Sequence, residues 1–346
     1  MQNDNAKYPP GVGLDIGTMN IVSAREAEGH TSTISIRDAF LTLEADAKRA
    51  LKLSNVSYIK RPDEDEYVVI GDGALAMANL FKREVSRPLS KGVIAAGELD
   101  AQWILSTLIA KVVGRPRVTG EHCFYSVPAE PIDVPGQDIV YHTEVFRQIL
   151  KEHGFVGHPT NEAMAIIFSQ CSEEKFSGLS MSFGSGMCNI ALAYQANSGM
   201  AFSVARGGDW VDAHSAKAVG KTASQMCAIK EKGINLSSPE GRDQQAIAMY
   251  IRNLIEYCFK AIASEFKKVA NEIELPEPIP LVVSGGTTKA AGFMDLFREE
   301  FERIRKRFPI QISDIRHANN PLTAVAEGLL VLAHEEHEED APNASD

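Results

Sequence analysis

The chain has 346 residues, of which 44% are hydrophobic, and its formal net charge at pH 7 is −11. Because a single hydrophobic core rarely grows far beyond about 250 residues, this length predicts two lobes. The acidic balance argues against a direct nucleic-acid partner, since binding the phosphate backbone requires a basic surface that displaces condensed counterions.

The cysteines and the N-terminus bear on the compartment. Five cysteines stand singly, with no CxxC pair and no nearby histidine at metal-ligand spacing, which is typical of a reduced, cytoplasmic environment. The N-terminal MQNDNAKYPP lacks the basic start and apolar run of a signal peptide, and no segment approaches the roughly 18 apolar residues that span a bilayer. We therefore expect a soluble protein without direct membrane attachment.

Two pairs of β-type runs, each interrupted by glycine, open the two halves of the chain. The first pair is VGLDIG with IVSA, and the second is LSMSFGSG with NIALAY. A strand that ends in small residues and resumes at once is typical of a hairpin, because glycine supplies the positive φ of the turn. Two such hairpins predict two similar lobes.

Helical and strand patterns alternate along the rest of the chain. AQWILSTLIAKVV and HTEVFRQILKEHG carry apolar residues at helical spacing, and HCFYSVP lies between them as a buried strand. A long helix is predicted over residues 246–273, before Pro276 and Pro278, and the apolar strand IPLVVSGG follows. This alternation predicts an α/β fold with helices packed on mixed sheets. The acidic run at residues 337–346 is predicted to be disordered.

The first candidate phosphate site is the turn after the first strand. Gly17 lets the backbone approach a phosphate, Thr18 and Asn20 add side-chain donors on either side of Met19, and Asp15 can hold a hydrated magnesium ion. By itself this turn is equally compatible with a plain tight hairpin.

Two further glycine-rich turns follow strands later in the chain. The second turn contains Gly184, Ser185, Gly186 and Met187, and the third contains Gly285, Gly286 and Thr287. The second turn is placed to cradle outer phosphates from the opposite side. The third lies before a predicted helix, and helix N-termini with open glycine backbones suit a nucleotide's ribose and inner phosphates. On its own, the third turn is also typical of a plain strand-to-helix connection.

Three glycine-rich strand turns in this order resemble the phosphate-one, phosphate-two and adenosine motifs of the actin, chaperone ATPase and sugar kinase superfamily. The segments at residues 161–165 and 321–328 resemble its two interlobe helices. Residues 87–94 and 207–212, the latter with Gly208 and Asp209, resemble segments of MreB-type bacterial actins that sugar kinases lack.

Residues 227–232 are similar to a stretch of actins and MamK-type bacterial actins whose lysine and glutamate edge the adenosine pocket. Here these residues are Lys230 and Glu231. Taken alone, they are also compatible with a surface helix carrying a solvated Lys-Glu pair.

The resemblance implies two lobes, each a mixed sheet flanked by helices, with ATP or ADP and Mg²⁺ in the cleft between them. The lobe I core would comprise residues 10–33, 71–160 and 319–336, with a small outer subdomain at 34–70. The lobe II core would comprise residues 161–215 and 268–318, with an abbreviated outer subdomain at 216–267. Residues 337–346 would form the acidic tail.

The resemblance also assigns roles in ATP hydrolysis. Asp15 would organise magnesium through water, and Glu162, which matches the glutamate of the first interlobe helix, would orient or deprotonate the attacking water. The sequence departs from the family at Ser182, where an aspartate is usual, and at Asn189, where relatives often have aspartate. A serine can hold a metal only weakly, through water, so hydrolysis is expected to be slow or absent.

The leading hypothesis is an actin-like ATP-binding protein that assembles into homopolymeric filaments. The alternative is a non-polymerising adaptor or regulator of the same fold that uses ATP as a structural ligand. A sugar or small-acid kinase ranks below both, because the sequence shows no larger insertion that would carry a dedicated substrate aspartate.

Overall fold

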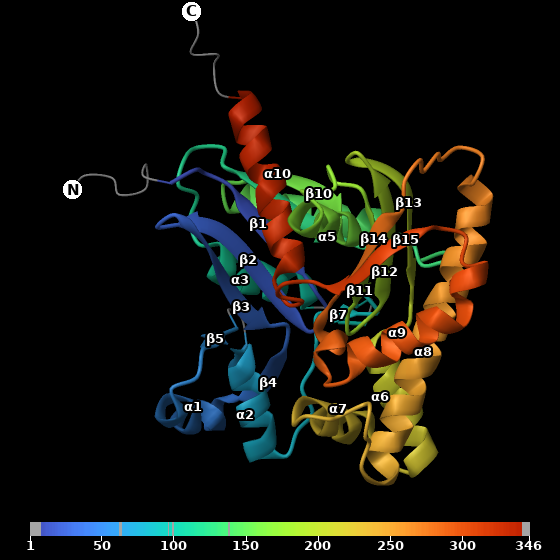
Figure 1. Cartoon of the computed structure of the whole chain (residues 1–346). Coiled ribbons are helices and arrows are strands. Elements are labelled where there is room, and N and C mark those ends of the chain that lie inside the picture. Colours follow the sequence, from blue (N-terminus) through green and yellow to red (C-terminus); the bar gives the residue numbers. More distant parts are fainter. Residues whose placement is uncertain (1–7, 62–63, 96, 99, 138, 341–346) are drawn as a thin grey trace, which may run out of the picture.

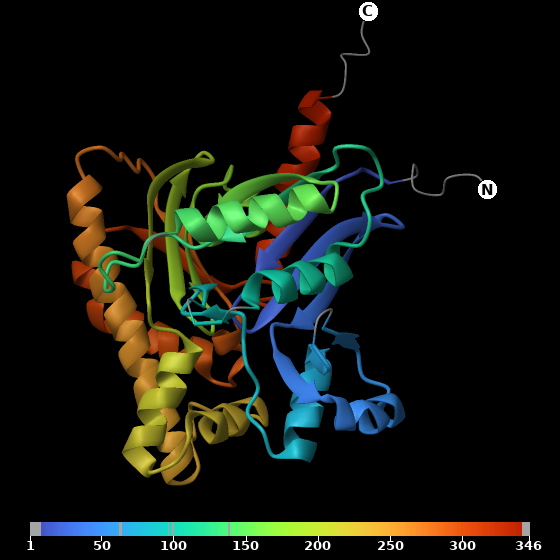
Figure 2. The same cartoon turned by 180° about the vertical axis from the view of Figure 1, so that it is seen from behind.

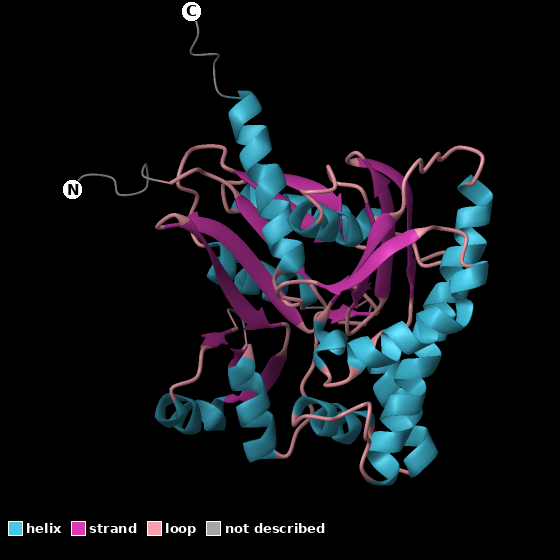
Figure 3. Cartoon of the chain, viewed as in Figure 1, coloured by secondary structure: helices cyan, strands magenta, loops and turns pink. Residues whose placement is uncertain are grey.

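Two five-stranded sheets form the centre of the molecule (Figures 1 and 3). The computed structural model describes residues 8–61, 64–95, 97–98, 100–137 and 139–340. The first sheet has the order β10-β9-β1-β2-β3 and the second the order β13-β12-β11-β14-β15. The strands of the first sheet are β1 (Val12–Ile16), β2 (Asn20–Ala27), β3 (His30–Arg37), β9 (His122–Val127) and β10 (Val156–Asn161). Those of the second are β11 (Gly178–Phe183), β12 (Cys188–Tyr194), β13 (Asn197–Val204), β14 (Ile279–Ser284) and β15 (Ile312–His317).

The two sheets have the same topology. In each, three sequential strands form an antiparallel meander. A later strand pairs in parallel with the first strand of that meander, and the last strand pairs in parallel with this added strand. The predicted hairpins are confirmed as β1–β2 and β11–β12. The predicted α/β fold with two similar lobes is therefore confirmed.

The helices confirm most of the periodicity in the sequence. They are α3 (Ala101–Val113), α4 (Val140–Glu152), α5 (Glu162–Gln170), α6 (Gly208–Val219), α7 (Ala223–Glu231), α8 (Gly241–Val269), α9 (Phe293–Ile304) and α10 (Ala324–Asp340). The long helix α8 begins and ends a few residues earlier than predicted. None of the helices that the structure describes combines the length and the apolar character that crossing a bilayer requires.

Smaller elements lie beside each large sheet. The strands β4 (Phe40–Glu44), β5 (Tyr58–Lys60) and β6 (Glu66–Ile70) form a three-stranded sheet with the helices α1 (Lys48–Ser54) and α2 (Asp72–Phe81) next to it. A two-stranded sheet consists of β7 (Leu89–Ser90) and β8 (Val93–Ile94). In Figure 1 the group of β4, α1 and α2 lies below the first sheet, and α6 and α7 lie below the second.

The residues that join the two lobes are small and apolar. Ala163 and Ala165 of α5 pack with Val282 of β14 and with Ala324 and Leu329 of α10 in one buried cluster. The helices α3 and α4 cover the opposite face of the first sheet, as seen from behind in Figure 2. The two helices α5 and α10 therefore lie between the sheets and connect them.

Close backbone contacts hold α10 in this place. A Cβ atom added to Gly328 would lie 1.8 Å from the carbonyl oxygen of Ala165, and one added to Gly13 would lie 1.9 Å from the carbonyl oxygen of Ala326. No side chain fits at either position, because these neighbours are backbone atoms. Glycine therefore sets the distances from α10 to α5 and to β1.

The structure corrects part of the prediction for the acidic tail. The prediction of disorder is wrong for residues 337–340, which form the last turn of α10, while residues 341–346 lie outside the described residues. The backbone N–H of His122 donates to Nε2 of His337 over 3.1 Å, and Nε2 of His122 lies 3.1 Å from Oδ2 of Asp340. These tertiary contacts stabilise a helix end that composition alone makes unfavourable.

Gly328→Ala tests the contact between α5 and α10. At an exposed helix position alanine is more stable than glycine by roughly 1 kcal/mol, but here we expect a loss of about 3 kcal/mol in the free energy of unfolding, because the added methyl group overlaps backbone. Urea denaturation followed by circular dichroism measures this loss. Gly97→Ala is the control, since no described atom lies within 4 Å of a Cβ atom there. Unchanged stability of Gly328→Ala would contradict the packing argument.

Candidate functional site

A cavity of about 500 Å³ lies between the two sheets, within the range of small-molecule sites. It is lined by every residue that the sequence analysis assigned to a site: Asp15, Gly17, Thr18, Met19, Asn20, Glu162, Ser182, Gly184, Ser185, Gly186, Met187, Gly208, Asp209, Lys230, Glu231, Gly285, Gly286 and Thr287. These residues come from segments far apart in the chain, and the fold brings all of them to one cavity.

The first two glycine turns have the same hydrogen bond. The N–H of Gly17 donates to the carbonyl of Asn20 over 3.0 Å, and the N–H of Gly184 donates to the carbonyl of Met187, also over 3.0 Å. The shared bond follows from the equivalent places of β1–β2 and β11–β12 in their sheets. Among the described residues, the N–H of Thr18 makes no hydrogen bond, so it is available to an anion.

The two turns contact each other across the lobes. A Cβ atom on Gly186 would lie 2.5 Å from Oγ1 of Thr18 and 2.6 Å from the backbone nitrogen of Gly92. The N–H of Gly92 donates to the same threonine oxygen over 3.2 Å. Glycine is required at position 186, because any side chain there would push the two turns apart.

The third turn is tied to the second. Gly285 has a φ of 98°, and a Cβ atom there would lie 2.5 Å from the carbonyl oxygen of Phe183, so only glycine fits. The hydroxyl of Thr287 donates to the carbonyl of Gly184 over 3.0 Å. A short 3₁₀ helix (Gly286–Lys289) follows the turn, and α9 begins only at Phe293, so the helix predicted to follow directly is not α-helical.

Two carboxylates project into the cavity from different elements. Asp15 lies near the end of β1, where Oδ1 accepts from the hydroxyl of Ser126 over 2.9 Å, and the N–H of Ile16 donates to the same hydroxyl oxygen over 2.8 Å. Glu162 is the first residue of α5, whose first turn is capped by the side chain of Asn161. The carboxylates thus stand at the end of a strand and the start of a helix.

Both carboxylates have raised pKa values. Burial raises the pKa of Asp15, and burial followed by repulsion from Asp15 raises the pKa of Glu162. Among the described residues, no lysine, arginine or histidine forms an ion pair with either group. Two half-buried carboxylates at one cavity that form no ion pair with a basic side chain of the described residues fit a divalent cation with oxygen ligands, such as Mg²⁺.

Ser182 and Asn189, where relatives usually or often carry aspartate, hold Glu162 by both oxygens. The hydroxyl of Ser182 donates to Oε1 over 2.6 Å, and the amide of Asn189 donates to Oε2 over 2.7 Å. Asn189 is itself oriented by the hydroxyl of Ser203, which donates to Oδ1 over 2.5 Å. Aspartate at either position would place a further negative charge beside Glu162. The uncharged Ser182 and Asn189 instead donate hydrogen bonds to it and are therefore compatible with the glutamate.

The rim of the cavity is lined by ion pairs. Nζ of Lys230 lies 2.8 Å from a carboxylate oxygen of Asp212 and donates to the carbonyl of Gly208 over 3.1 Å. Glu231 pairs with Arg37 of β3 over 2.7 Å, so this contact crosses from one lobe to the other. The lysine and glutamate are therefore held by other elements and are not simply a solvated pair on a surface helix.

Asp209 is also paired. Its carboxylate lies 2.9 Å from a guanidinium nitrogen of Arg87 and accepts from the hydroxyl of Ser185 over 3.1 Å. Arg87 belongs to the segment before β7 in the first lobe, and Asp209 to the first turn of α6 in the second. This pair is a second contact between the lobes at the cavity.

Sequence reasoning missed several lining residues. Ser126 contacts Asp15, and a signal for it existed: it lies near the carboxyl end of β9, parallel to β1, which is where ligand sites of such sheets gather. Arg37 lies at the end of β3, outside the glycine-rich motifs, and Lys289 ends the third glycine-rich segment, in the 3₁₀ helix. Their positions depend on the fold.

Comparison with known proteins identifies a matching family model and solved structures with the same fold. A family model described as Volactin matches residues 11–333. No curated protein matches the sequence of the chain. Among solved structures, the MamK double helical filament is similar over 96% of this chain and 99% of its own, with a TM-score of 0.66 and 15% sequence identity.

Two further solved structures have the same fold. MreB 5 of Spiroplasma citri bound to AMPPNP has a TM-score of 0.65 at 16% identity, covering 96% of this chain and 98% of its own. The ethanolamine utilization protein EutJ from Carboxydothermus hydrogenoformans has a TM-score of 0.53 at 16% identity, covering 94% of this chain and 90% of its own. The two-lobed actin-like fold predicted from the glycine turns is thus confirmed.

Asp15→Asn tests the uncompensated charge. A carboxyl group with a raised pKa adds stability that is fully present below its unfolded pKa, about 4, and is lost as pH rises through the folded pKa. Without nucleotide and magnesium, we expect the variant to be more stable than wild type at pH 8 by about 1–3 kcal/mol, and the gain to vanish near pH 4. Thermal unfolding across this pH range measures it, with the exposed Asp46→Asn as control. A variant less stable than wild type at pH 8 would refute the argument.

Proposed function

The chain belongs to the Volactin family, and we propose that it is an actin-like cytoskeletal protein that binds ATP or ADP with Mg²⁺ and assembles into homopolymeric filaments in the cytoplasm. One observation carries the proposal: three glycine-rich turns from both lobes, and two carboxylates that form no ion pair within the described part of the chain, line a single cavity. Exposed backbone N–H groups beside carboxylates are the combination that a magnesium-bound polyphosphate requires.

The two sides of the cavity suit different parts of a nucleotide. We assign the outer phosphates to the contacting turns at Gly17 and Gly186, where the backbone can approach closely. The ribose and adenine belong to the side formed by Gly286, Lys230 and Glu231, which lies in the second lobe. A nucleotide in this position would touch both lobes at once, so its binding energy would favour one arrangement of the lobes over others.

Magnesium is the cation that this donor set fits. Asp15 would hold it through water, and when bound it neutralises the charge that develops on the terminal phosphate oxygens. Ser182 donates to Glu162 and has no charge, so its contribution to a metal-bound water is weak. Glu162 is therefore left as the main charged group that can orient a water molecule for hydrolysis.

The environment of Glu162 bears on the rate of hydrolysis. A raised pKa makes the carboxylate a better proton acceptor, but repulsion from Asp15 favours the protonated form, which cannot accept a proton. Both carboxylate oxygens also already accept hydrogen bonds from Ser182 and Asn189. We therefore propose a weak ATPase in which binding, more than turnover, determines the state of the lobes.

Self-assembly is tested by sedimentation. Purified chain is spun with Mg²⁺-ATP, with Mg²⁺-ADP and without nucleotide, and the pellets are viewed by negative-stain electron microscopy. We expect filaments with ATP and fewer without it, because nucleotide contacts both lobes and sets the surfaces that meet in a head-to-tail polymer. A chain that binds ATP but stays monomeric in all conditions would support the adaptor or regulator instead.

Calorimetry in the same buffers separates binding from assembly. Asp15→Ala is expected to weaken magnesium-dependent ATP binding at least tenfold, while the exposed control Asp46→Ala leaves it unchanged. ATP is also expected to raise the melting temperature of wild type, since it binds only the folded state. Neither heat nor a thermal shift at millimolar Mg²⁺-ATP would overturn the proposed function.

Variants at Ser182 and Glu162 test the account of hydrolysis. If the missing carboxylate limits the rate, Ser182→Asp should hydrolyse ATP faster than wild type in the presence of magnesium, because the added charge fixes the metal beside the terminal phosphate. Ser182→Ala serves as the control, since it removes the hydroxyl without adding charge. Glu162→Ala should lower turnover and leave binding intact. Phosphate release measures the turnover of each variant. If wild type hydrolyses ATP briskly and Ser182→Asp is no faster, the absence of an aspartate at position 182 does not limit hydrolysis.

A further inference from the structure

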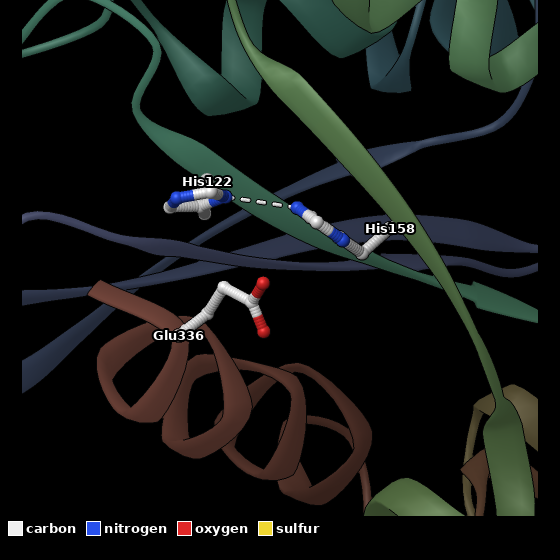
Figure 4. Close-up of side chains that lie close together, drawn as sticks. All are labelled: His122, His158 and Glu336. Atoms are coloured by element: carbon white, nitrogen blue, oxygen red, sulfur yellow. Dashed lines mark hydrogen bonds between the residues drawn. The ribbon is translucent and has the colours of Figure 1, made fainter. Parts of the chain in front are cut away.

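A cluster of histidines lies at the end of α10 that is remote from the nucleotide cavity. Val325, in the first turn of α10, lines that cavity. Glu336 lies eleven residues further along the same helix, which corresponds to about 16 Å of helix length. There α10 meets β9 and β10 of the first sheet, and His122 and His158 project from these strands toward it (Figure 4).

The sheet places the two histidines on the same face. His158 of β10 is in register with Phe124 of β9, two residues after His122, and side chains two residues apart point to the same side of a strand. The ring of His158 stacks on that of Phe124 with centroids 4.6 Å apart and an interplanar angle of 12°. His122 is buried, and His158 and Glu336 are half-buried. The rings are thus fixed by their surroundings, and Glu336 keeps some freedom to adjust.

The distances suit a shared ligand. Nδ1 of His122 lies 2.8 Å from Nε2 of His158, and one ring nitrogen of each histidine and one carboxylate oxygen of Glu336 all lie within 4.8 Å of one another. Two ligand nitrogens on tetrahedral zinc, each about 2.0–2.1 Å from the metal, are separated by roughly 3.4 Å. A movement of about half an ångström between the rings, with a rotamer adjustment of Glu336, therefore accommodates the ion.

A second carboxylate orients the buried histidine. Nε2 of His122 lies 3.1 Å from Oδ2 of Asp340, one turn of α10 beyond Glu336. Donation from Nε2 to this carboxylate leaves the lone pair on Nδ1, directed at His158. A metal-binding histidine commonly donates its other ring N–H to a carboxylate in this way. With this tautomer, Nε2–H of His158 donates to Nδ1 of His122, and a bound cation would take the place of that proton.

We propose that His122, His158 and Glu336 form a zinc site, oriented by Asp340, that fastens the last turns of α10 to β9 and β10. Two imidazole nitrogens and one carboxylate are ligands that favour zinc over magnesium, which prefers oxygen alone. Three protein ligands leave a fourth position for water. His337 is not a ligand through Nε2, because that nitrogen accepts the backbone N–H of His122. This site is independent of the nucleotide cavity.

The test is zinc binding by the full-length, tag-free chain after metal removal. Zinc is titrated in competition with a chromophoric chelator, without nucleotide, and a parallel titration uses magnesium. We expect one zinc per chain, no comparable magnesium binding and a higher melting temperature with zinc, because a ligand of the folded state stabilises it. Cobalt in place of zinc should give the visible absorption of a four-coordinate ion.

Variants on α10 and β10 assign the ligands. Glu336→Gln and His158→Ala should each weaken zinc binding at least tenfold and abolish the thermal shift, and Asp340→Asn should weaken it about tenfold to a hundredfold by releasing His122. Glu338→Gln is the matched control, because it removes the same charge from an exposed position of the same helix, and His30→Ala controls for an exposed histidine. Both controls should bind as wild type does.

Two results would overturn the proposal. The first is the absence of saturable zinc binding by wild type, which would leave the cluster as a hydrogen-bonded contact between helix and sheet. The second is zinc binding that Glu336→Gln and His158→Ala leave unchanged while circular dichroism shows both to be folded, which would place the metal elsewhere. Neither result bears on nucleotide binding, because the variants lie outside the cavity.

Discussion

The close approach of α10 to its neighbours is the constraint on which the site depends. Glycine at positions 13 and 328 lets the helix backbone touch β1 on one side and α5 on the other. Asp15 follows Gly13 by two residues, and Glu162 begins α5. A larger side chain at either glycine would separate α10 from the strand or from the helix, and with it the two carboxylates. The geometry of the cavity is therefore set by backbone contacts outside it.

The electrostatics of the cavity follow from that placement. Asp15 and Glu162 are half-buried at the same cavity and neither has a basic partner among the described residues, and repulsion from Asp15 adds to burial in raising the pKa of Glu162. Ser182 and Asn189 reduce the problem, because they donate hydrogen bonds where aspartate would add a third or fourth negative charge. The two departures from the actin-like superfamily pattern thus belong to one local arrangement around Glu162, whose two carboxylate oxygens both accept hydrogen bonds.

Contacts between the lobes lie at the cavity, along α10, and between residues 129–133 of the first lobe and residues 203–206 of the second. The glycine turns meet at Gly186, and the pairs Arg37–Glu231 and Arg87–Asp209 join elements of opposite lobes at the rim. At its other end α10 is held by the histidine cluster on β9 and β10. One helix therefore has one end at the cavity between the lobes and the other at the histidine cluster. Its position is fixed by packing in the middle and by polar contacts at the end.

Local structure and the glycine-rich turns that line the cavity could be predicted from the sequence alone. Hairpins, amphipathic helices and glycine turns are written in residues that are neighbours along the chain, so VGLDIG with IVSA and LSMSFGSG with NIALAY predicted β1–β2 and β11–β12 correctly. The order of the three glycine-rich turns, together with the two segments that resemble interlobe helices, indicates the actin-like fold. The resemblance also singled out Glu162, because it stands at a motif position.

Contacts between side chains that are distant in the chain depend on the tertiary structure. Ser126 contacts Asp15 across 111 residues, Arg37 contacts Glu231 across 194, and His122 contacts Asp340 across 218. No local pattern encodes such pairs, because they arise when strands and helices distant in the chain pack together. The same reason explains the wrong prediction for residues 337–340. Composition counts the charges of that segment, but the partners that order it lie on another element.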